Sequence, residues 1–241
     1  PWDHLTFLIM YNIESLEQIV TGRAESFFKQ DLNSHREQLR DAFADRSILI
    51  IGAAGSIGTA VTKLLLEFPV ANIKLVDINE NDLVEVVRDI RSSDLGTPKN
   101  LTSHPIDFGS PEFAAFMKDS PKFDYIFNLA ALKHVRSEKD IYSISRMLKV
   151  NVGFVDQLLG SLDYDLKKYF SVSSDKAVDP ANIMGASKLL MERCLIFHSD
   201  RHPASTARFA NVAFSKGSLP YGFLHRLQKN QPLSGPKDIK R

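Results

Sequence analysis

Two patterns of hydrophobic and polar positions alternate along the chain from Ser47 onward. Short apolar runs are typical of strands buried on both faces, and apolar positions recurring every three or four residues are typical of amphipathic helices. Strands are predicted at Ser47–Ile51, Ile73–Asp77, Leu101–Ile106, Asp124–Leu129, Tyr169–Ser173 and Thr206–Ala210. Helices are predicted near 56–67, 80–92, 110–119, 140–161, 184–199 and 218–229. Because strands and helices alternate, we expect an α/β fold with a doubly wound parallel sheet.

The chain on either side of this pattern differs in character. Before Ser47, the stretches IESLEQIV and HREQLRDAF have helical spacing, and Gly22 is placed to end a helix. The tail QPLSGPKDIKR is rich in proline, glycine and charge. We therefore expect a helical N-terminal extension over 1–45, the α/β domain over 46–210, and over 211–241 the truncated beginning of a small C-terminal substrate lobe.

Composition narrows the classes of partner. Thirty basic residues nearly balance 29 acidic ones, so charge gives no reason to expect nucleic acid or a membrane surface as a partner. Cys194 is the only cysteine, which excludes an intrachain disulfide and favours a cytoplasmic protein. His198 and His202 have the spacing of paired metal ligands, but no glutamate lies between them, so no metal site is expected.

A glycine-rich loop follows the first predicted strand and opens a helix, in the order Gly52, Ala53, Ala54, Gly55, Ser56, Ile57, Gly58. In a dinucleotide-binding loop of a Rossmann fold, the first glycine permits a tight turn, the second admits the pyrophosphate, and the third lets helix and strand pack closely. Asp77 ends the next strand 19 positions after Gly58, where an acid binds the adenosine ribose and repels a 2′-phosphate. We expect NAD rather than NADP. The alternative is a simple tight turn, with Asp77 only capping the following helix.

Further cofactor contacts are expected where the third and fourth strands end. Asp107 and Phe108 follow the third strand, and Leu129, Ala130 and Ala131 follow the fourth. Ligands of doubly wound sheets bind at these carboxyl ends, and small residues let a dinucleotide lie against the backbone. The alternative is ordinary loop chemistry.

Groups that transfer protons gather after the fifth strand. Ser174, Asp175 and Lys176 supply a hydroxyl, a carboxyl and an amine, and Lys188 follows on the next helix. Beside a nicotinamide, such groups serve chemistry on an alcohol or a carbonyl.

Several of these runs together resemble one enzyme family. GAAGSIG, NLAALKHV, the segment at Asn151, SSDKAVDPANIMGASK and RFANVAFSKGS resemble the UDP-N-acetylglucosamine 4,6-dehydratases, the polysaccharide-biosynthesis branch of the extended short-chain dehydrogenases. The resemblance implies an NAD-dependent lyase. NAD takes a hydride from C4 of a UDP-sugar, Lys176 removes the C5 proton, Asp175 protonates the departing C6 hydroxyl, and the hydride returns to C6. Ser174 holds the C4 oxygen, and Lys188 serves both cofactor and reaction.

Met184 occupies the position of the tyrosine in the general pattern Tyr-x-x-x-Lys. A thioether cannot transfer a proton, so the usual base for the C4 hydroxyl is missing. The resemblance includes a subgroup with methionine here, in which Lys188 and a water or Asp175 would take over. The alternative is an impaired enzyme.

Contacts with the substrate are expected from Lys133, His134, Asn151, Asn211 and Ser215. By the resemblance Lys133 and His134 face the sugar or diphosphate, although chemistry alone also allows solvated loop residues. Arg208, with Asn211 and Ser215, would begin the substrate lobe, and the alternative is an edge strand that runs into a polar loop. The resemblance also implies a homo-oligomer. Two rival functions remain, a nucleotide-sugar 4-epimerase and a non-catalytic NAD sensor.

Overall fold

The computed structural model describes residues 18, 19, 21–93, 100–133 and 138–233. Leu39–Ala210 forms one compact unit, and the described residues on either side of it form a second, smaller unit. The predicted divisions at residues 45 and 210 remain predictions. Across the part of the chain that is described, no helix combines the length and apolar character needed to cross a membrane.

The larger unit is built on one parallel sheet, as predicted. Its strands are β1 (Ser47–Ile51), β2 (Asn72–Asp77), β3 (Leu101–Pro105), β4 (Tyr125–Asn128), β5 (Lys168–Ser174) and β6 (Ala204–Phe209). Their order across the sheet is β3-β2-β1-β4-β5-β6, and every neighbouring pair is parallel. The order therefore reverses between β1 and β4, where a doubly wound sheet opens a crevice at the carboxyl ends of its strands.

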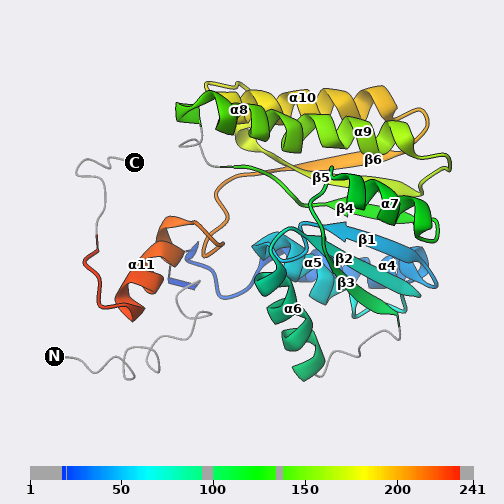
Figure 1. Cartoon of the computed structure of the whole chain (residues 1–241). Helices are drawn as coiled ribbons and strands as arrows, with labels where there is room; N and C mark the ends of the chain where they lie inside the picture. The colour runs from blue at the N-terminus through cyan, green and yellow to red at the C-terminus, as the bar shows by residue number, and fades with distance from the viewer. Residues whose placement is uncertain (1–17, 20, 94–99, 134–137, 234–241) are drawn as a thin grey trace. The chain divides into compact units, whose positions relative to one another are not determined.

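Helices cover both faces of the sheet (Figure 1). They are α4 (Arg36–Phe43), α5 (Ser56–Leu65), α6 (Glu80–Ser92), α7 (Pro111–Asp119), α8 (Ile141–Leu148), α9 (Phe154–Ser161) and α10 (Ile183–His198). Local signals set several starts, because the side chains of Asn79, Ser110 and Asn182 each accept a hydrogen bond from the first turn of the helix that follows.

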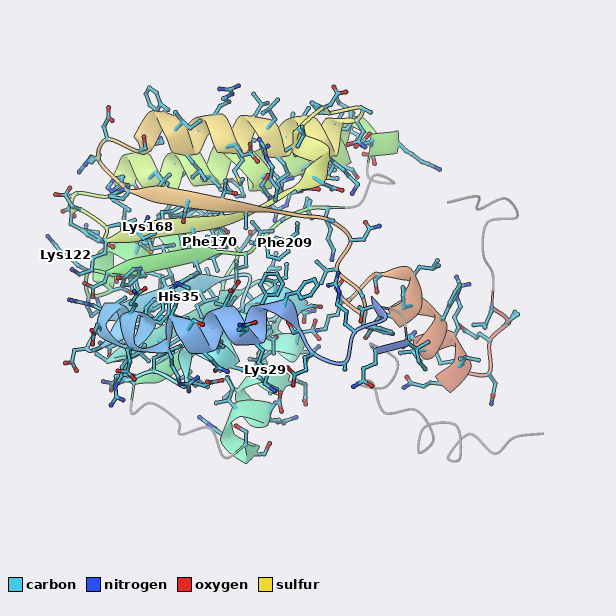
Figure 2. All side chains as sticks on the ribbon, turned by 180° about the vertical axis from the view of Figure 1, so that it is seen from behind. Lys29, His35, Lys122, Lys168, Phe170 and Phe209 are labelled. Atoms are coloured by element: carbon cyan, nitrogen blue, oxygen red, sulfur yellow. The ribbon has the colours of Figure 1, made fainter. Side chains whose placement is uncertain are left out.

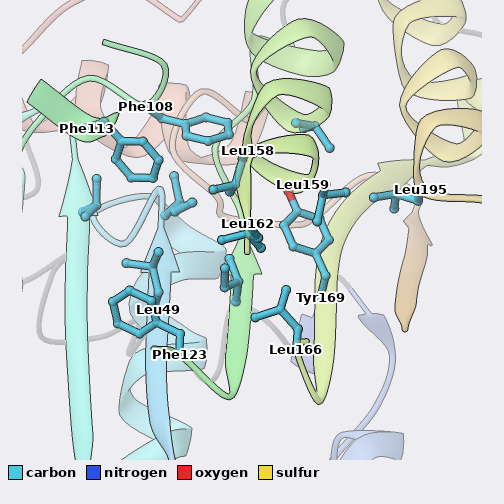
Figure 3. Packing of buried hydrophobic residues seen from close by; sticks show 14 of the residues in the cluster. Leu49, Phe108, Phe113, Phe123, Leu158, Leu159, Leu162, Leu166, Tyr169 and Leu195 are labelled. Carbon is cyan, nitrogen blue, oxygen red and sulfur yellow. The ribbon is translucent and has the colours of Figure 1, made fainter. Parts of the chain in front are cut away.

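One face of the sheet packs against α7, α9 and α10. Leu49, Ile126 and Tyr169 project from the strands and pack with Leu158 and other side chains of the helices, and all are buried (Figure 3). The alternation of side chains along each strand sends the intervening residues, such as Ile48 and Ile50, to the opposite face.

The opposite face packs against α5, α6 and the end of α4. Phe43 of α4 meets the ring of Tyr125 at 5.2 Å between centroids. Phe170 of β5, seen from behind the view of Figure 1, lies 6.0 Å from Phe127 of β4 (Figure 2). Apolar side chains thus cover both faces of the sheet, and polar functional groups are expected at the ends of the strands.

The predicted helix over 140–161 is wrong in one detail. The structure has α8 and α9 joined by a π-helical segment, η2 (Lys149–Gly153), in place of one regular helix. A π-helical turn contains one residue more than an α-turn, and here Val150 and Asn151 are buried within it.

The smaller unit contains α3 (Phe27–Ser34) and α11 (Leu219–Gln228), capped by Ser26 and Ser218. The predicted helix at 218–229 corresponds to α11, and the predicted HREQLRDAF helix to α4. IESLEQIV falls largely outside the described residues, and α3 was not predicted.

Candidate active site

The glycine loop connects β1 to α5 in a conformation that requires glycine at two positions. Gly52 has a φ of +78°, and a Cβ there would overlap the backbone of Ala130 and lie 2.7 Å from the carbonyl carbon of Leu129. A Cβ on Gly58 would overlap the Gly52 carbonyl oxygen. The close packing of helix and strand predicted for Gly58 is therefore observed.

Gly55 has a different reason to be small. It is exposed, and it caps α5 without a side chain, so nothing covers the approach to the first turn of that helix. The positive end of the helix dipole and its backbone N–H groups favour an anion at such a position.

A cavity of about 220 Å³ lies beside this loop at the reversal of strand order. Eight predicted cofactor residues line it, namely Gly52, Gly55, Asp77, Asp107, Phe108, Leu129, Ala130 and Ala131. Five others do not, since Ala54, Ser56, Ile57 and Gly58 form the loop and first turn of α5 and Lys188 lies in α10. The predicted contacts did not include the other seven residues of this lining, namely Ile51, Val76, Ile78, Ile106, Leu132, Arg146 and Val150.

Asp77 stands on the wall of the cavity with both carboxylate oxygens held by backbone groups. Ala54 N–H donates to Oδ2 at 2.9 Å, and Asn79 N–H donates to Oδ1 at 2.9 Å. The side chain that caps α6 is that of Asn79, which accepts from Asp82 N–H at 3.1 Å. Because Asn79 caps the helix, capping does not account for Asp77, and its predicted role in binding the ribose remains a prediction.

Asp107 is held by an ion pair that has no signal in the sequence. Arg146 Nη2 donates to its Oδ2 at 2.8 Å, and both residues line the cavity. Arg146 also lies 5.8 Å from the ring of Phe154. The pair fixes the direction of one carboxylate in the cavity wall.

The residues at the end of β5 are called the reaction loop. They begin at Ser174, the last residue of the strand, and continue through the short 3₁₀ turn η3 (Asp175–Ala177). Ser174 Oγ donates to Asp175 Oδ1 at 3.0 Å and accepts from Lys176 N–H at 3.3 Å. Lys176 Nζ donates to the same Asp175 oxygen at 3.2 Å. The three predicted groups therefore lie in mutual contact, and each keeps access to solvent.

These hydrogen bonds change the pKa of Asp175, the residue that the resemblance assigns as the acid. The hydrogen bond from Ser174, followed by that from Lys176, lowers the pKa of the Asp175 carboxyl. The free protein therefore favours the carboxylate of Asp175. A role as general acid requires a substrate hydroxyl to displace one of these donors or to desolvate the pair.

The first turn of α10 packs directly on the reaction loop. A Cβ at Gly185 would overlap the carbonyl oxygen of Lys176, so glycine permits this approach. Met184 is buried, as is Lys188, whose Nζ donates to the Val172 carbonyl at 2.8 Å. Burial lowers the pKa of Lys188 to about 8, so a fraction of the neutral amine is present near neutral pH.

Asn151 is buried in the π-helical segment and bonds to the loop that follows β4. Its Nδ2 donates to the Leu132 carbonyl at 3.0 Å and to Ser187 Oγ at 2.9 Å, and its Oδ1 accepts from Leu132 N–H at 3.0 Å. These contacts tie the loop to α10. The predicted contact of Asn151 with a substrate remains a prediction.

The other predicted substrate residues are dispersed. Lys133 is exposed in the loop after β4, and His134 lies outside the described residues. Asn211 and Ser215 belong to the smaller unit, where Ser215 Oγ donates to the Val212 carbonyl at 2.9 Å. Their roles remain predictions.

The expectation that Arg208 begins the substrate lobe is wrong. Arg208 lies within β6 and makes a two-pronged ion pair with Glu192 of α10, at 2.9 Å and 2.7 Å. Glu192 also accepts from Ser173 Oγ at 2.5 Å. A strongly polar residue in an edge strand is thus explained by a buried partner on the covering helix.

Comparison with known protein families agrees with this architecture. The family model described as polysaccharide biosynthesis protein matches residues 48–237. The chain belongs to the polysaccharide biosynthesis protein family. The match includes the glycine loop, the cavity and the reaction loop described above.

Individual relatives are more distant. An uncharacterized membrane protein of Methanocaldococcus jannaschii is 31% identical over 211 residues, covering 82% of this chain and 58% of the relative. A UDP-glucose 4-epimerase of Rickettsia massiliae is 27% identical, covering 80% of this chain and 56% of the relative. This polysaccharide biosynthesis protein chain therefore spans little more than half the length of the curated relatives it matches.

Solved structures share the fold. Pen from Bacillus thuringiensis has a TM-score of 0.67 at 25% identity, covering 78% of this chain and 57% of that one. WbmF of Bordetella bronchiseptica, solved with NAD⁺, has a TM-score of 0.61 at 17% identity, and the match covers 81% of this chain and 63% of WbmF. UDP-glucuronic acid 4-epimerase of Bacillus cereus has a TM-score of 0.63 at 16% identity, and the match covers 78% of this chain and 64% of the epimerase. They confirm the doubly wound fold of this family member.

Proposed function

We propose that this polysaccharide biosynthesis protein is a nucleotide-sugar 4,6-dehydratase that acts with NAD on a UDP-N-acetylhexosamine. The observation that carries the proposal is the contact between Asp175 and Lys176, an acid and an amine 3.2 Å apart at the carboxyl end of β5. Elimination of water needs one group to remove a proton and another to protonate the leaving hydroxyl. A 4-epimerase needs no acid for C6.

The residues of the cavity fit NAD. Gly52 and Ala130 meet at a distance that no larger residue at 52 would permit, and Gly55 leaves the first turn of α5 open for a pyrophosphate. Asp77 presents a carboxylate where a ribose diol would bind. When bound, NAD supplies a hydride acceptor that later returns the hydride. The NAD-bound structures of WbmF and the Bacillus cereus epimerase support the same cofactor here.

The chain's own residues then divide the proton transfers. Lys176 removes the C5 proton, which a ketone at C4 makes acidic, and Asp175 protonates the C6 oxygen as water departs. Ser174 donates its hydroxyl hydrogen to the C4 oxygen in place of the bond that it makes to Asp175 in the free protein. The buried amine of Lys188 lies one helical turn beyond Met184, and its lowered pKa leaves a fraction of it neutral and able to accept a proton near neutral pH.

A nucleotide-sugar 4-epimerase is the second candidate. Matched relatives named UDP-glucose 4-epimerase favour it. Both reactions begin with oxidation at C4, so the cavity does not separate them. The acid–amine pair on the reaction loop favours elimination.

Turnover of UDP-N-acetylglucosamine, followed by NMR, tests the proposal. We expect the C6 hydroxymethyl signal to disappear and a methyl doublet to form. A sugar inverted at C4 means an epimerase, and an unchanged sugar contradicts both enzymes.

Two lysine variants at opposite ends of β5 make a matched pair for this assay. Lys176→Met removes the proposed base and should abolish the methyl signal. Lys168→Met changes an exposed lysine at the start of the same strand, labelled in Figure 2, and should leave turnover unchanged. Equal activity of the two variants would contradict the assigned role of Lys176.

A further inference from the structure

The resemblance gives the proton of the C4 hydroxyl to Lys188 with a water or to Asp175, and the structure offers a third acceptor. Oxidation at C4 removes a hydride from carbon and a proton from the hydroxyl. Met184 occupies the position where a tyrosine would take that proton, and a thioether cannot. Its side chain is also buried, at 4% exposed.

A carboxylate from a distant part of the chain is bound at this residue. Glu138 Oε1 accepts a hydrogen bond from the backbone N–H of Met184 at 2.8 Å, although the two residues are 46 positions apart. Glu138 lies just before α8, whose N-cap is Asp140. The side chain is half-buried, so part of it remains exposed to solvent.

The same turn of α10 contacts the reaction loop. Gly185, next to Met184, packs against the carbonyl of Lys176 so closely that a Cβ would overlap it. The carboxylate of Glu138 is thus bound one residue away from the backbone that carries the acid–amine pair. Its Oε1 accepts the hydrogen bond from Met184 N–H, and Oε2 is the oxygen that takes no part in this bond.

A second contact joins the same helix to the loop after β4. Asn151 bonds to Leu132 and to Ser187 of α10, so the described end of that loop is held against the helix on which Glu138 is bound.

We propose that Glu138 accepts the proton of the sugar's C4 hydroxyl in place of the missing tyrosine, an inference that rests on the proposed dehydratase function. As the C4–H bond breaks, its electron pair leaves as hydride to NAD, the O–H proton moves to the Glu138 carboxylate, and a C4=O double bond forms. Asp175 later loses one proton to the departing hydroxyl. Lys176 returns its proton to C5 as the hydride adds to C6, and the proton on Glu138 balances the loss from Asp175 after exchange with solvent, so no proton is gained or lost over the cycle.

Two variants separate proton transfer from a purely structural cap. Glu138→Gln keeps an oxygen that accepts from Met184 N–H but removes the base, whereas Glu138→Ala removes both. We expect Glu138→Gln to lower kcat about 100-fold, the usual contribution of a general base, with KM and thermal unfolding unchanged. Glu138→Ala should lower kcat at least as much.

The oxidation half-reaction locates the defect. In the Lys176→Met background elimination is blocked, and a single turnover with UDP-N-acetylglucosamine should accumulate NADH, read by its absorbance. Adding Glu138→Gln should slow that accumulation by the same factor of about 100.

Each other outcome is decisive. Normal kcat in Glu138→Gln with loss in Glu138→Ala would show a cap alone and overturn the inference. So would an unchanged rate of NADH formation in the double variant. If the unaltered protein binds NAD but neither reduces it nor alters the sugar, the proposed function fails first, and the inference fails with it.

Discussion

Single residues explain why the cofactor loop takes one form only. Gly52 and Gly58 are required by backbone overlap, whereas Gly55 is required only if a ligand approaches it. The glycine spacing alone predicted all three positions. It could not predict Arg146 or Glu138, because their bonds span 39 and 46 positions with no motif between the partners.

Alanine substitutions at Gly52 and at Gly55 should have different effects, the first on stability and the second on NAD binding. Gly52→Ala should lower the free energy of unfolding by about 3 kcal/mol, because a positive φ and overlap with Ala130 both penalise the added methyl. Gly55→Ala should change stability by less than about 1 kcal/mol but weaken NAD binding about tenfold or more. Urea unfolding and calorimetry measure the two effects. Gly153→Ala, where a Cβ meets nothing within 4 Å, is the control, and a stability loss there equal to that of Gly52→Ala would refute the argument.

Lys188 should make stability depend on pH. Its pKa is lowered from 10.5 to about 8, so between these values the unfolded chain binds more protons than the folded one. Stability of the unaltered protein relative to Lys188→Met should therefore rise with pH across this window, by about 1 kcal/mol per pH unit, and stay flat below it. Urea unfolding of both proteins from about pH 7 to about pH 10 measures the difference. A difference that is flat throughout, or that falls with pH, is incompatible with a buried amine.

At the scale of elements, the bounds of buried apolar segments were the easiest to predict from the sequence. β1 matches its prediction at both ends because all five of its residues are buried and apolar or small. The π-helical segment was not predicted, since one extra residue in a turn barely disturbs the apolar spacing on either side. Arg208 was misplaced because its partner Glu192 lies on another element.

The π-helical segment should be needed to order the loop after β4. Asn151→Ala leaves the N–H and carbonyl of Leu132 without their partner and removes one of the two bonds of the Ser187 hydroxyl, which still donates to the Met184 carbonyl; it should cost about 2–4 kcal/mol. Hydrogen exchange at the Leu132 amide should accelerate, measured by mass spectrometry on peptides of that loop. Asn100→Ala, which removes only a long 3.5 Å bond to Ala71, is the matched control. Unaltered exchange at Leu132 would mean that the segment does not hold the loop.

At the scale of the whole molecule, strand order is what brings the site together. β1 and β4 are neighbours although five elements, α5, β2, α6, β3 and α7, separate them along the chain, and this places Gly52 against Ala130. The fold class was predictable because every strand alternates with a helix. Substrate identity and the expected homo-oligomer remain predictions, since the chain spans little more than half of its curated relatives.

The central claim is that the cavity beside the glycine loop binds NAD, and calorimetric titration of the purified protein tests it most directly. Nucleotide that copurifies is first identified by denaturing a sample. We predict one NAD per chain, bound about tenfold or more tightly than NADP, because the Asp77 carboxylate repels a 2′-phosphate. Protein that releases no nucleotide on denaturation and gives no heat with NAD would contradict the account.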